Sequence, residues 1–231
     1  MSHKHWNTPE IAALRKTAVD FSAAEILPYQ DQWEEDGQIP RELSGKAGKL
    51  GLLGLAFPTE AGGEGAGMRE STAVAEAMHE AGVAAGVQAS LFTVTISCPH
   101  IVAGGDHDLI DKYVRPTLSG DRIGSLGITE PGGGSDVGNL KTTAVKDGDE
   151  YVINGSKTFI TSAVRGEFTV VAARTGGDAL KGARGGFADR RGQRHPGLRG
   201  HPQADEDGVA LVRHRRDLLD RRARPHGQPR R

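Results

Sequence analysis

Apolar residues in the first half of the chain recur every three or four positions, the spacing of amphipathic helices. The first such stretch opens at Thr8, Pro9 and Glu10, which offer an N-cap hydroxyl, a proline at the first helical position and an acid in the first turn. Its apolar positions keep the helical spacing as far as Pro28 and are Ile11, Leu14, Ala18, Phe21 and Ile26. The same pattern predicts further helices over residues 40–50, 68–81, 85–97 and 108–118.

From residue 123 onward the pattern changes to short segments typical of β-strands. The dipeptides Asp147-Gly148 and Asn154-Gly155 tolerate the positive φ that tight hairpin turns require. The expected strands, separated by these turn signals, cover residues 140–146, 150–153, 157–161 and 168–174. The sequence therefore predicts an α+β fold, with an N-terminal all-α helical domain over residues 1–122 and a partial antiparallel β-domain over residues 123–183.

Composition excludes several classes of protein. The 231 residues carry a formal charge of −1 and are 36% hydrophobic and 26% charged, as in globular proteins. There is no run of eighteen apolar residues, and the N-terminus is polar, so we expect no membrane partner, no signal peptide and a cytoplasmic location. The lone Cys98 cannot form an internal disulfide, and His3 and His5 have no partner cluster, so no metal site is predicted.

Ahead of these four strands, the strand pattern that starts at residue 123 leads into the loop L-G-I-T-E-P-G-G-G-S-D at residues 126–136. This loop offers bare backbone N–H groups, hydroxyls and little bulk, which suits a planar heterocycle or a pyrophosphate. Its glycine spacing fits neither a G-x-G-x-x-G fingerprint nor a P-loop, and a purely structural turn is the alternative reading. Glu130 and Asp136 could do acid–base work, but we favour a role in fixing the loop through hydrogen bonds to backbone N–H groups.

Five segments of residues 8–182 together resemble the acyl-CoA dehydrogenase family. They are I-P-R-E-L at 39–43, G-L-L-G-L-A-F-P at 51–58, A-G-G at 61–63, I-T-E-P-G-G-G-S-D at 128–136 and Y-V-I-N-G-S-K-T-F-I-T at 151–161. The last two segments, in this order and at this spacing, are the most specific. The resemblance implies a flavoprotein of fatty acid metabolism, an oxidoreductase that binds FAD non-covalently beside its β-domain.

The resemblance also implies which residues bind FAD. Thr129 would bond the pyrimidine side of the flavin, Thr161 would donate toward N5, and Ser135 would lie near both the pyrophosphate and the acyl-CoA substrate. Phe159 stands where the family often has Trp, and Leu126 where an aromatic residue is common. The full set of implied cofactor-binding residues is Leu126, Gly127, Ile128, Thr129, Gly134, Ser135, Phe159, Ile160 and Thr161.

The family reaction is α,β-dehydrogenation of an acyl-CoA thioester, with electrons passed on to an electron-transfer flavoprotein. In the family, the catalytic base lies on a C-terminal helical domain, and subunit contacts of the homo-oligomer are largely C-terminal. Since this chain ends at Arg231, we assign no catalytic residue and expect a truncated, inactive form. A non-catalytic FAD- or acyl-CoA-binding remnant is the alternative.

Residues 184–231 differ in composition from the rest. They contain thirteen arginines and no lysine or isoleucine, and Phe187 is the last aromatic residue of the chain. Burial of so little apolar surface cannot offset the roughly 1–2 kcal/mol of backbone entropy that each ordered residue loses. We therefore expect a disordered Arg-rich tail. Binding of nucleic acid by this tail is disfavoured because acidic residues interrupt its positive charge.

A reading-frame shift near residues 181–186 is our preferred explanation of this tail. Possible GC-rich codons for residues 186–192, read one nucleotide later, can encode Val-Ser-Leu-Ile-Val-Val. Three later segments can likewise encode stretches that resemble, in order, the family's continuation through its β-domain. Each match alone is weak, because the code is degenerate, but four in order favour the shift.

Overall fold

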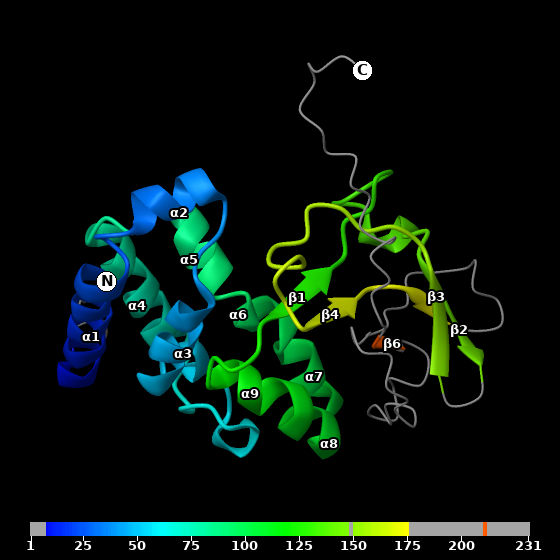
Figure 1. The fold of residues 1–231 in the computed structure, drawn as a ribbon. Coiled ribbons are helices and arrows are strands. Elements are labelled where there is room, and N and C mark those ends of the chain that lie inside the picture. The colour runs from blue at the N-terminus through cyan, green and yellow to red at the C-terminus, as the bar shows by residue number, and fades with distance from the viewer. Residues whose placement is uncertain (1–7, 148–149, 176–209, 212–231) are drawn as a thin grey trace, which may run out of the picture. The chain divides into compact units, whose positions relative to one another are not determined.

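The computed structural model describes residues 8–147, 150–175 and 210–211 (Figure 1). The chain divides into two compact units. The helical unit comprises Met1–Gly124 with Val164–Gly166, and the β unit comprises Ser125–Ala163 with Glu167–Arg231.

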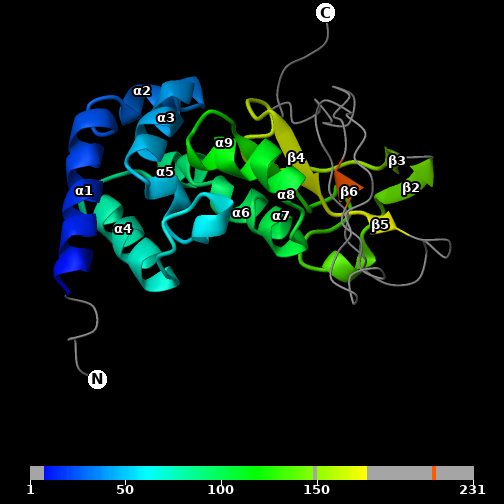
Figure 2. The same ribbon diagram turned by 90° about the horizontal axis from the view of Figure 1, so that it is seen from below.

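The helical unit consists of short helices joined by tight connections. Its α-helices are α1 (Pro9–Glu25), α2 (Gln30–Asp36), α3 (Arg41–Lys49), α4 (Met68–Glu80), α5 (Ala85–Leu91), α6 (Val94–Ser97), α7 (Pro99–Gly104), α8 (His107–Leu109) and α9 (Arg115–Leu118). A π-helical turn, Ile110–Val114, joins α8 to α9, and 3-10 turns lie at Leu52–Gly54 and Thr59–Ala61. Helices α1 and α4 lie side by side (Figures 1 and 2).

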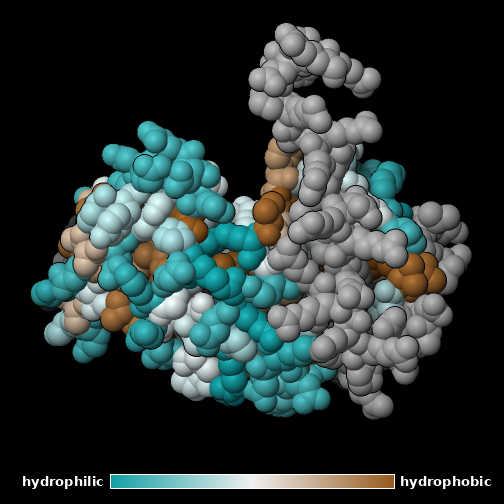
Figure 3. Space-filling view, viewed as in Figure 1, coloured by the Kyte–Doolittle hydropathy of each residue, from teal (hydrophilic) through white to brown (hydrophobic). Residues whose placement is uncertain are grey.

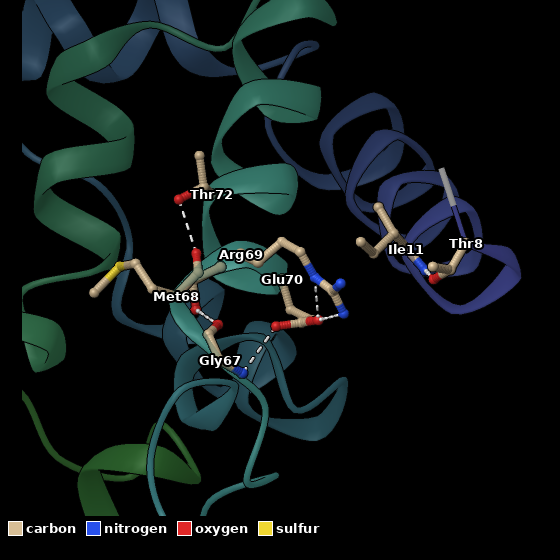
Figure 4. Close-up of polar contacts among 8 residues, drawn as sticks. Thr8, Ile11, Gly67, Met68, Arg69, Glu70 and Thr72 are labelled. Atoms are coloured by element: carbon tan, nitrogen blue, oxygen red, sulfur yellow. Dashed lines mark hydrogen bonds and ion pairs between the residues drawn. The ribbon is translucent and has the colours of Figure 1, made fainter. Parts of the chain in front are cut away.

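Local sequence signals explain where the two long helices begin. Thr8 is the N-cap of α1, and its hydroxyl accepts a hydrogen bond of 3.3 Å from the backbone N–H of Ile11. At the start of α4 the carboxylate of Glu70 accepts a 2.9 Å bond from the backbone N–H of Gly67 and also binds Arg69 (Figure 4). These contacts satisfy N–H groups that the first turn of a helix leaves without partners.

Three of the helix predictions are confirmed, and two predicted helices differ in how continuous they are. The start at Pro9 and the helices at 40–50 and 68–81 are present. The single helix predicted over residues 85–97 is wrong, because the chain breaks between Leu91 and Val94 into α5 and α6. The segment 108–118 is helical throughout but contains the π turn, and α7 was not predicted.

Apolar side chains on the facing surfaces of these helices form the core of the helical unit. Helix α1 buries Ile11, Ala18 and Phe21, and α4 buries Val74 and Met78. Figure 3 shows that the visible face of this unit is mainly hydrophilic, with scattered hydrophobic side chains. Among the described residues no single helix is long and apolar enough to cross a membrane; the bent pair Ala85–Leu91 and Val94–Gly104 meets that test only when its parts are counted together.

In the described part of the β unit the strands form two three-stranded sheets. One has the order β1 (Gly124–Gly127), β4 (Phe168–Val171), β6 (Ala210–Leu211), and the other has the order β3 (Glu150–Asn154), β2 (Thr143–Asp147), β5 (Arg174–Thr175). Strands β2 and β3 are antiparallel, from Thr143 opposite Asn154 to Asp147 opposite Glu150, as the hairpin prediction requires. The turn residues 148–149 lie outside the described residues.

The predicted antiparallel sheet is correct only in part. Strand β2 pairs with β5 in parallel, with Thr143 opposite Arg174. Strand β5 runs opposite to β3 but lies on the other side of β2, so its direction matches that of β2. Part of the expected tail also forms a strand, since Ala210 and Leu211 pair antiparallel with β4. The other residues of the expected tail lie outside the described part of the chain, so the prediction that they are disordered stays a prediction.

Candidate functional site

The loop after β1 is held by hydrogen bonds within its own backbone, and most of its residues are exposed. Glu130 and Gly133 exchange backbone hydrogen bonds of 2.9 and 3.1 Å, which fold the sequence E-P-G-G into a tight turn. Residues 131–139 are exposed. A Cβ atom placed on Gly132 or Gly133 would meet no described atom within 4 Å, so the backbone of this turn can be approached closely.

The carboxylate of Glu130 is the centre of a hydrogen-bond cluster beneath the loop. It accepts bonds from the backbone N–H of Lys141 at 2.6 Å and of Thr142 at 2.8 Å, and from the hydroxyl of Thr142. It also binds the ammonium group of Lys157, whose Nζ lies 2.8 Å from Oε1. The predicted role of Glu130, binding backbone N–H groups, is confirmed, whereas Asp136 accepts from the side chain of Asn139 at 3.0 Å.

Lys157 joins the second sequence motif to the first. Its Nζ atom donates to the carbonyl oxygen of Ile128 at 2.8 Å as well as to Glu130. One residue further on, the backbone N–H of Thr158 donates to the carbonyl oxygen of Thr129 at 2.8 Å. The side chains of Lys157 and Glu130 are 9% and 8% exposed, so this ion pair is buried.

Gly155 lets the chain approach this cluster. A Cβ atom on Gly155 would lie 2.3 Å from the hydroxyl oxygen of Thr142 and 2.7 Å from its Cα atom, so only glycine fits between β3 and the start of β2 at this point. The Asn154-Gly155 pair was predicted as a hairpin turn. Its glycine is required for close packing.

Burial and hydrogen bonding act in opposite directions on the ionisation of the pair. Burial raises the pKa of Glu130, but the bonds from Lys157, Thr142 and Lys141 outweigh it and lower the pKa to about 2. Burial lowers the pKa of Lys157, while the contact with Glu130 raises it, and the net direction is downward. The Glu130 carboxylate is therefore ionised at neutral pH.

The strand predicted over residues 157–161 is wrong. Phe159 and Ser162 have φ angles of 56° and 61°, in the left-handed region, and Ala163 N–H donates to the carbonyl of Ile160 in a turn. A strand needs extended residues throughout, and the inward bonds of Lys157 and Thr158 prevent that geometry. A left-handed phenylalanine costs on the order of 1–3 kcal/mol, and such strain collects at functional sites.

Phe159 projects away from the described chain. Its residue surface is 90% exposed, the highest value among the exposed large hydrophobic residues. A strained backbone and an exposed aromatic ring stabilise nothing in the β unit itself. Together they indicate a surface that is complete only when a partner or ligand covers the ring.

The candidate cofactor-binding residues fall on two joined segments of the β unit. Leu126 and Gly127 lie on β1, Ile128 and Thr129 follow it, and Gly134 and Ser135 lie in the exposed loop. Phe159, Ile160 and Thr161 lie on the segment after Lys157. The main residue that sequence reasoning missed is Lys157, and the signal for it was its position as the one charged residue of the motif at residues 151–161. No group of three or more His, Cys, Asp or Glu side chains suited to a metal ion occurs in the described chain.

The division of the chain near residue 124 coincides with the boundary between two matching family models. The family model "Acyl-CoA dehydrogenase, N-terminal domain" matches residues 8–121, and "Acyl-CoA dehydrogenase, middle domain" matches residues 125–216. The chain belongs to the acyl-CoA dehydrogenase family.

Individual relatives cover the same part of the chain. A putative acyl-CoA dehydrogenase from Mycobacterium smegmatis is 57% identical with a TM-score of 0.74, over 77% of this chain and 46% of that structure. The CarC subunit of the caffeyl-CoA reductase-Etf complex of Acetobacterium woodii is 37% identical over 74% of this chain and 45% of its own length. An acyl-CoA dehydrogenase from Bacillus anthracis, solved in complex with FAD, is 32% identical with a TM-score of 0.64, over 73% of this chain and 30% of that structure. The chain thus spans less than half the length of each of these relatives.

Proposed function

We propose that this chain contributes the flavin-binding part of an FAD-dependent acyl-CoA dehydrogenase, which oxidises the α,β bond of an acyl-CoA thioester. The observation that carries the proposal is the joining of two segments: the loop at residues 128–136 and the segment bearing Phe159 are connected by hydrogen bonds of Lys157 and Thr158. Both segments carry residues that the family resemblance implies for FAD.

The residues present fit an isoalloxazine and a pyrophosphate. The 90% exposed ring of Phe159 offers an apolar face for a flat heterocycle, and the exposed Gly-rich turn offers a surface without side chains. The residues that would hold FAD are Leu126, Gly127, Ile128, Thr129, Gly134, Ser135, Phe159, Ile160 and Thr161. When bound, FAD supplies the acceptor for the hydride that leaves the substrate.

Within this set we assign three hydroxyl roles. Thr129 binds the pyrimidine edge of the flavin, Thr161 donates toward N5, and Ser135 contacts the pyrophosphate and the acyl-CoA. Hydrogen-bond donors at these positions stabilise the negative charge of a reduced flavin. Acid–base chemistry at the substrate is not assigned to Glu130, because its carboxylate is buried and occupied by four donors.

The name of one relative supports the electron-transfer partner. The Acetobacterium woodii protein belongs to a complex of a caffeyl-CoA reductase with Etf. We propose an electron-transfer flavoprotein as partner and a CoA thioester as substrate for this chain too.

A second candidate function is FAD or acyl-CoA binding without turnover. The composition change at residue 184 favours this candidate, because residues 184–231, with thirteen arginines and no lysine, depart from the rest of the chain and support the frame-shift hypothesis.

One experiment separates these candidates. The purified full chain is titrated with FAD while flavin fluorescence is recorded, and then mixed anaerobically with acyl-CoA thioesters of graded length. FAD binding followed by bleaching of the flavin absorbance supports the dehydrogenase. FAD binding with no bleaching by any thioester supports binding without turnover, and no FAD binding contradicts the dehydrogenase and the FAD-binding form of the second candidate.

A further inference from the structure

The Glu130 carboxylate accepts more hydrogen bonds than any neutral side chain of its size could. Two backbone N–H groups, one hydroxyl and one ammonium group converge on its two oxygens. An ionised carboxylate is an acceptor only, with about four lone-pair positions, so it can satisfy this whole set. A glutamine at this position would turn an NH2 group toward at least one of the four donors.

These bonds connect three separate stretches of the β unit. Glu130 belongs to the loop after β1, Lys141 and Thr142 lead into β2, and Lys157 follows β3. Lys157 returns to the first stretch through its bond to the carbonyl of Ile128. Hence the backbone on both sides of Thr129 is fixed by the same pair of charges.

Phe159 is two residues beyond Lys157 and holds a φ of 56° with its ring 90% exposed. No packing of the ring can explain why the backbone stays in this unfavourable region. Strained residues persist only when their surroundings over-determine them. On the N-terminal side of Phe159 the fixed points are the Lys157 ammonium group and the Thr158 N–H, both bound to the first stretch.

We infer that Glu130 and Lys157 are positioning residues that hold the Thr129 loop and the Phe159 segment in their flavin-binding arrangement before FAD arrives. The inference rests on the proposed function and deepens it, because it assigns the site's preorganisation to a buried ion pair outside the set of residues proposed to hold FAD. Preorganisation of this kind raises affinity by removing the cost of ordering the site during binding.

The first test measures FAD affinity in a double-mutant cycle. We expect Lys157→Met to raise the Kd for FAD about tenfold or more, and Phe159→Ala to raise it similarly. If Lys157 acts by positioning Phe159, the double variant binds FAD hardly worse than either single variant. Full additivity of the two effects would overturn the inference. Lys16→Met and Asp20→Asn, which alter an exposed ion pair of α1 at 2.5 Å, are the matched controls and leave the Kd unchanged.

The second test needs no FAD, so it decides the inference even if the proposed function fails. Hydrogen exchange of the Thr158 amide is followed in the full chain. Since that amide donates to Thr129, we expect protection in the native chain and exchange about tenfold faster in Lys157→Met and in Glu130→Gln, with the β2–β3 amides unchanged. Unchanged exchange at Thr158 would overturn the positioning role. Loss of protection throughout β2 and β3 in both variants would also overturn it, because the pair would then stabilise the whole β unit.

Discussion

The guanidinium group of Arg165 donates a hydrogen bond of 3.1 Å to the carbonyl oxygen of Ile39, a residue 126 positions earlier in the chain. It also donates to the carbonyl of Ser90 at 2.9 Å. Ile39 precedes α3 and Ser90 lies in α5, so one side chain links the backbone before α3 to the backbone of α5. Val164–Gly166 therefore belongs to the helical unit, although the chain on both sides belongs to the β unit.

Replacing Arg165 by alanine should destabilise the helical unit. Each carbonyl oxygen loses a charged donor, and a bond to a charged group contributes about 1.5–3 kcal/mol. Thermal unfolding followed by circular dichroism would show a lower Tm. The control is Arg69→Ala, since the Arg69 side chain is 44% exposed and its ion pair with Glu70 contributes little. Equal Tm values for the two variants would contradict the role of Arg165.

Two glycines of α3 should respond in opposite directions to the same substitution. A Cβ atom on Gly48 would lie 2.2 Å from the carbonyl oxygen of Ser119, whereas one on Gly45 meets nothing within 4 Å. We expect Gly48→Ala to destabilise the chain by about 1–3 kcal/mol through overpacking. Gly45→Ala should stabilise it by about 0.5–1 kcal/mol, because alanine favours a helix interior. Denaturant unfolding measures both, and a stabilising Gly48→Ala would show that α3 does not pack against Ser119.

The hydrogen bonds that Lys141 and Thr142 donate to Glu130 should weaken in acid over a defined range. The pKa of Glu130 is about 2 in the folded chain, below its ordinary value of 4.5. A lowered carboxyl pKa contributes stability that is fully present above the unfolded pKa and is lost as pH falls from about 4.5 toward 2. Lys157 is the charged side chain facing Glu130; burial lowers its pKa, and the contact with Glu130 acts in the opposite direction.

Amide exchange at Lys141 and Thr142, measured at several pH values and corrected for the intrinsic rate, tests this dependence. Glu130→Gln removes the titrating group, so its corrected exchange should not change across the same range. A native chain whose protection is equally independent of pH would disprove the assignment.

Replacing Phe159 by glycine should change the stability of the free chain and its affinity for FAD in different ways. Glycine accepts the left-handed conformation freely, so Phe159→Gly should cost the free chain nothing or stabilise it by about 1 kcal/mol. The same variant should lose FAD affinity, because the exposed ring is gone. Ser162→Gly, at a φ of 61°, relieves similar strain without removing an aromatic ring and serves as the control. Retained FAD affinity in Phe159→Gly would exclude the ring from the site.

The thiol of Cys98 should report unfolding of the helical unit. It is fully buried, and burial raises its pKa to about 12, so little thiolate is present at neutral pH. A chromogenic disulfide reagent should therefore react slowly with the native chain and rapidly in denaturant, releasing one equivalent, since the sequence has one cysteine. Rapid reaction without denaturant would place the thiol in an accessible position.

How far the sequence predicts this fold depends on whether the signal is local. Thr8-Pro9-Glu10 predicts the start of α1 because a cap needs only neighbouring residues. The β2–β3 hairpin follows from alternation and a two-residue turn in the same way. The parallel β2–β5 pair has no local signal, since Thr143 and Arg174 are 31 positions apart and Arg174 continues a run that reads as one strand.

The candidate site shows the same division. The loop at Glu130 is visible as a glycine-rich motif, and its binding of backbone N–H groups follows from the chemistry of a carboxylate. The left-handed Phe159 is not visible, because phenylalanine and its neighbours favour a strand. Long-range bonds of Lys157 and Thr158 override that preference, and such bonds appear only once the chain is folded.

The parallel pairing of β2 and β5 limits how this protein can change over generations. Thr143 lies opposite both Asn154 and Arg174, so the connection that carries Lys157 and Phe159 begins and ends beside one residue. Three residues separate Asn154 from the bonded amide of Thr158, too few to absorb an insertion or a deletion. A lineage can therefore alter the surface proposed to bind flavin by exchanging side chains at fixed length, while a codon gained or lost before Thr158 would pull Lys157 away from Glu130.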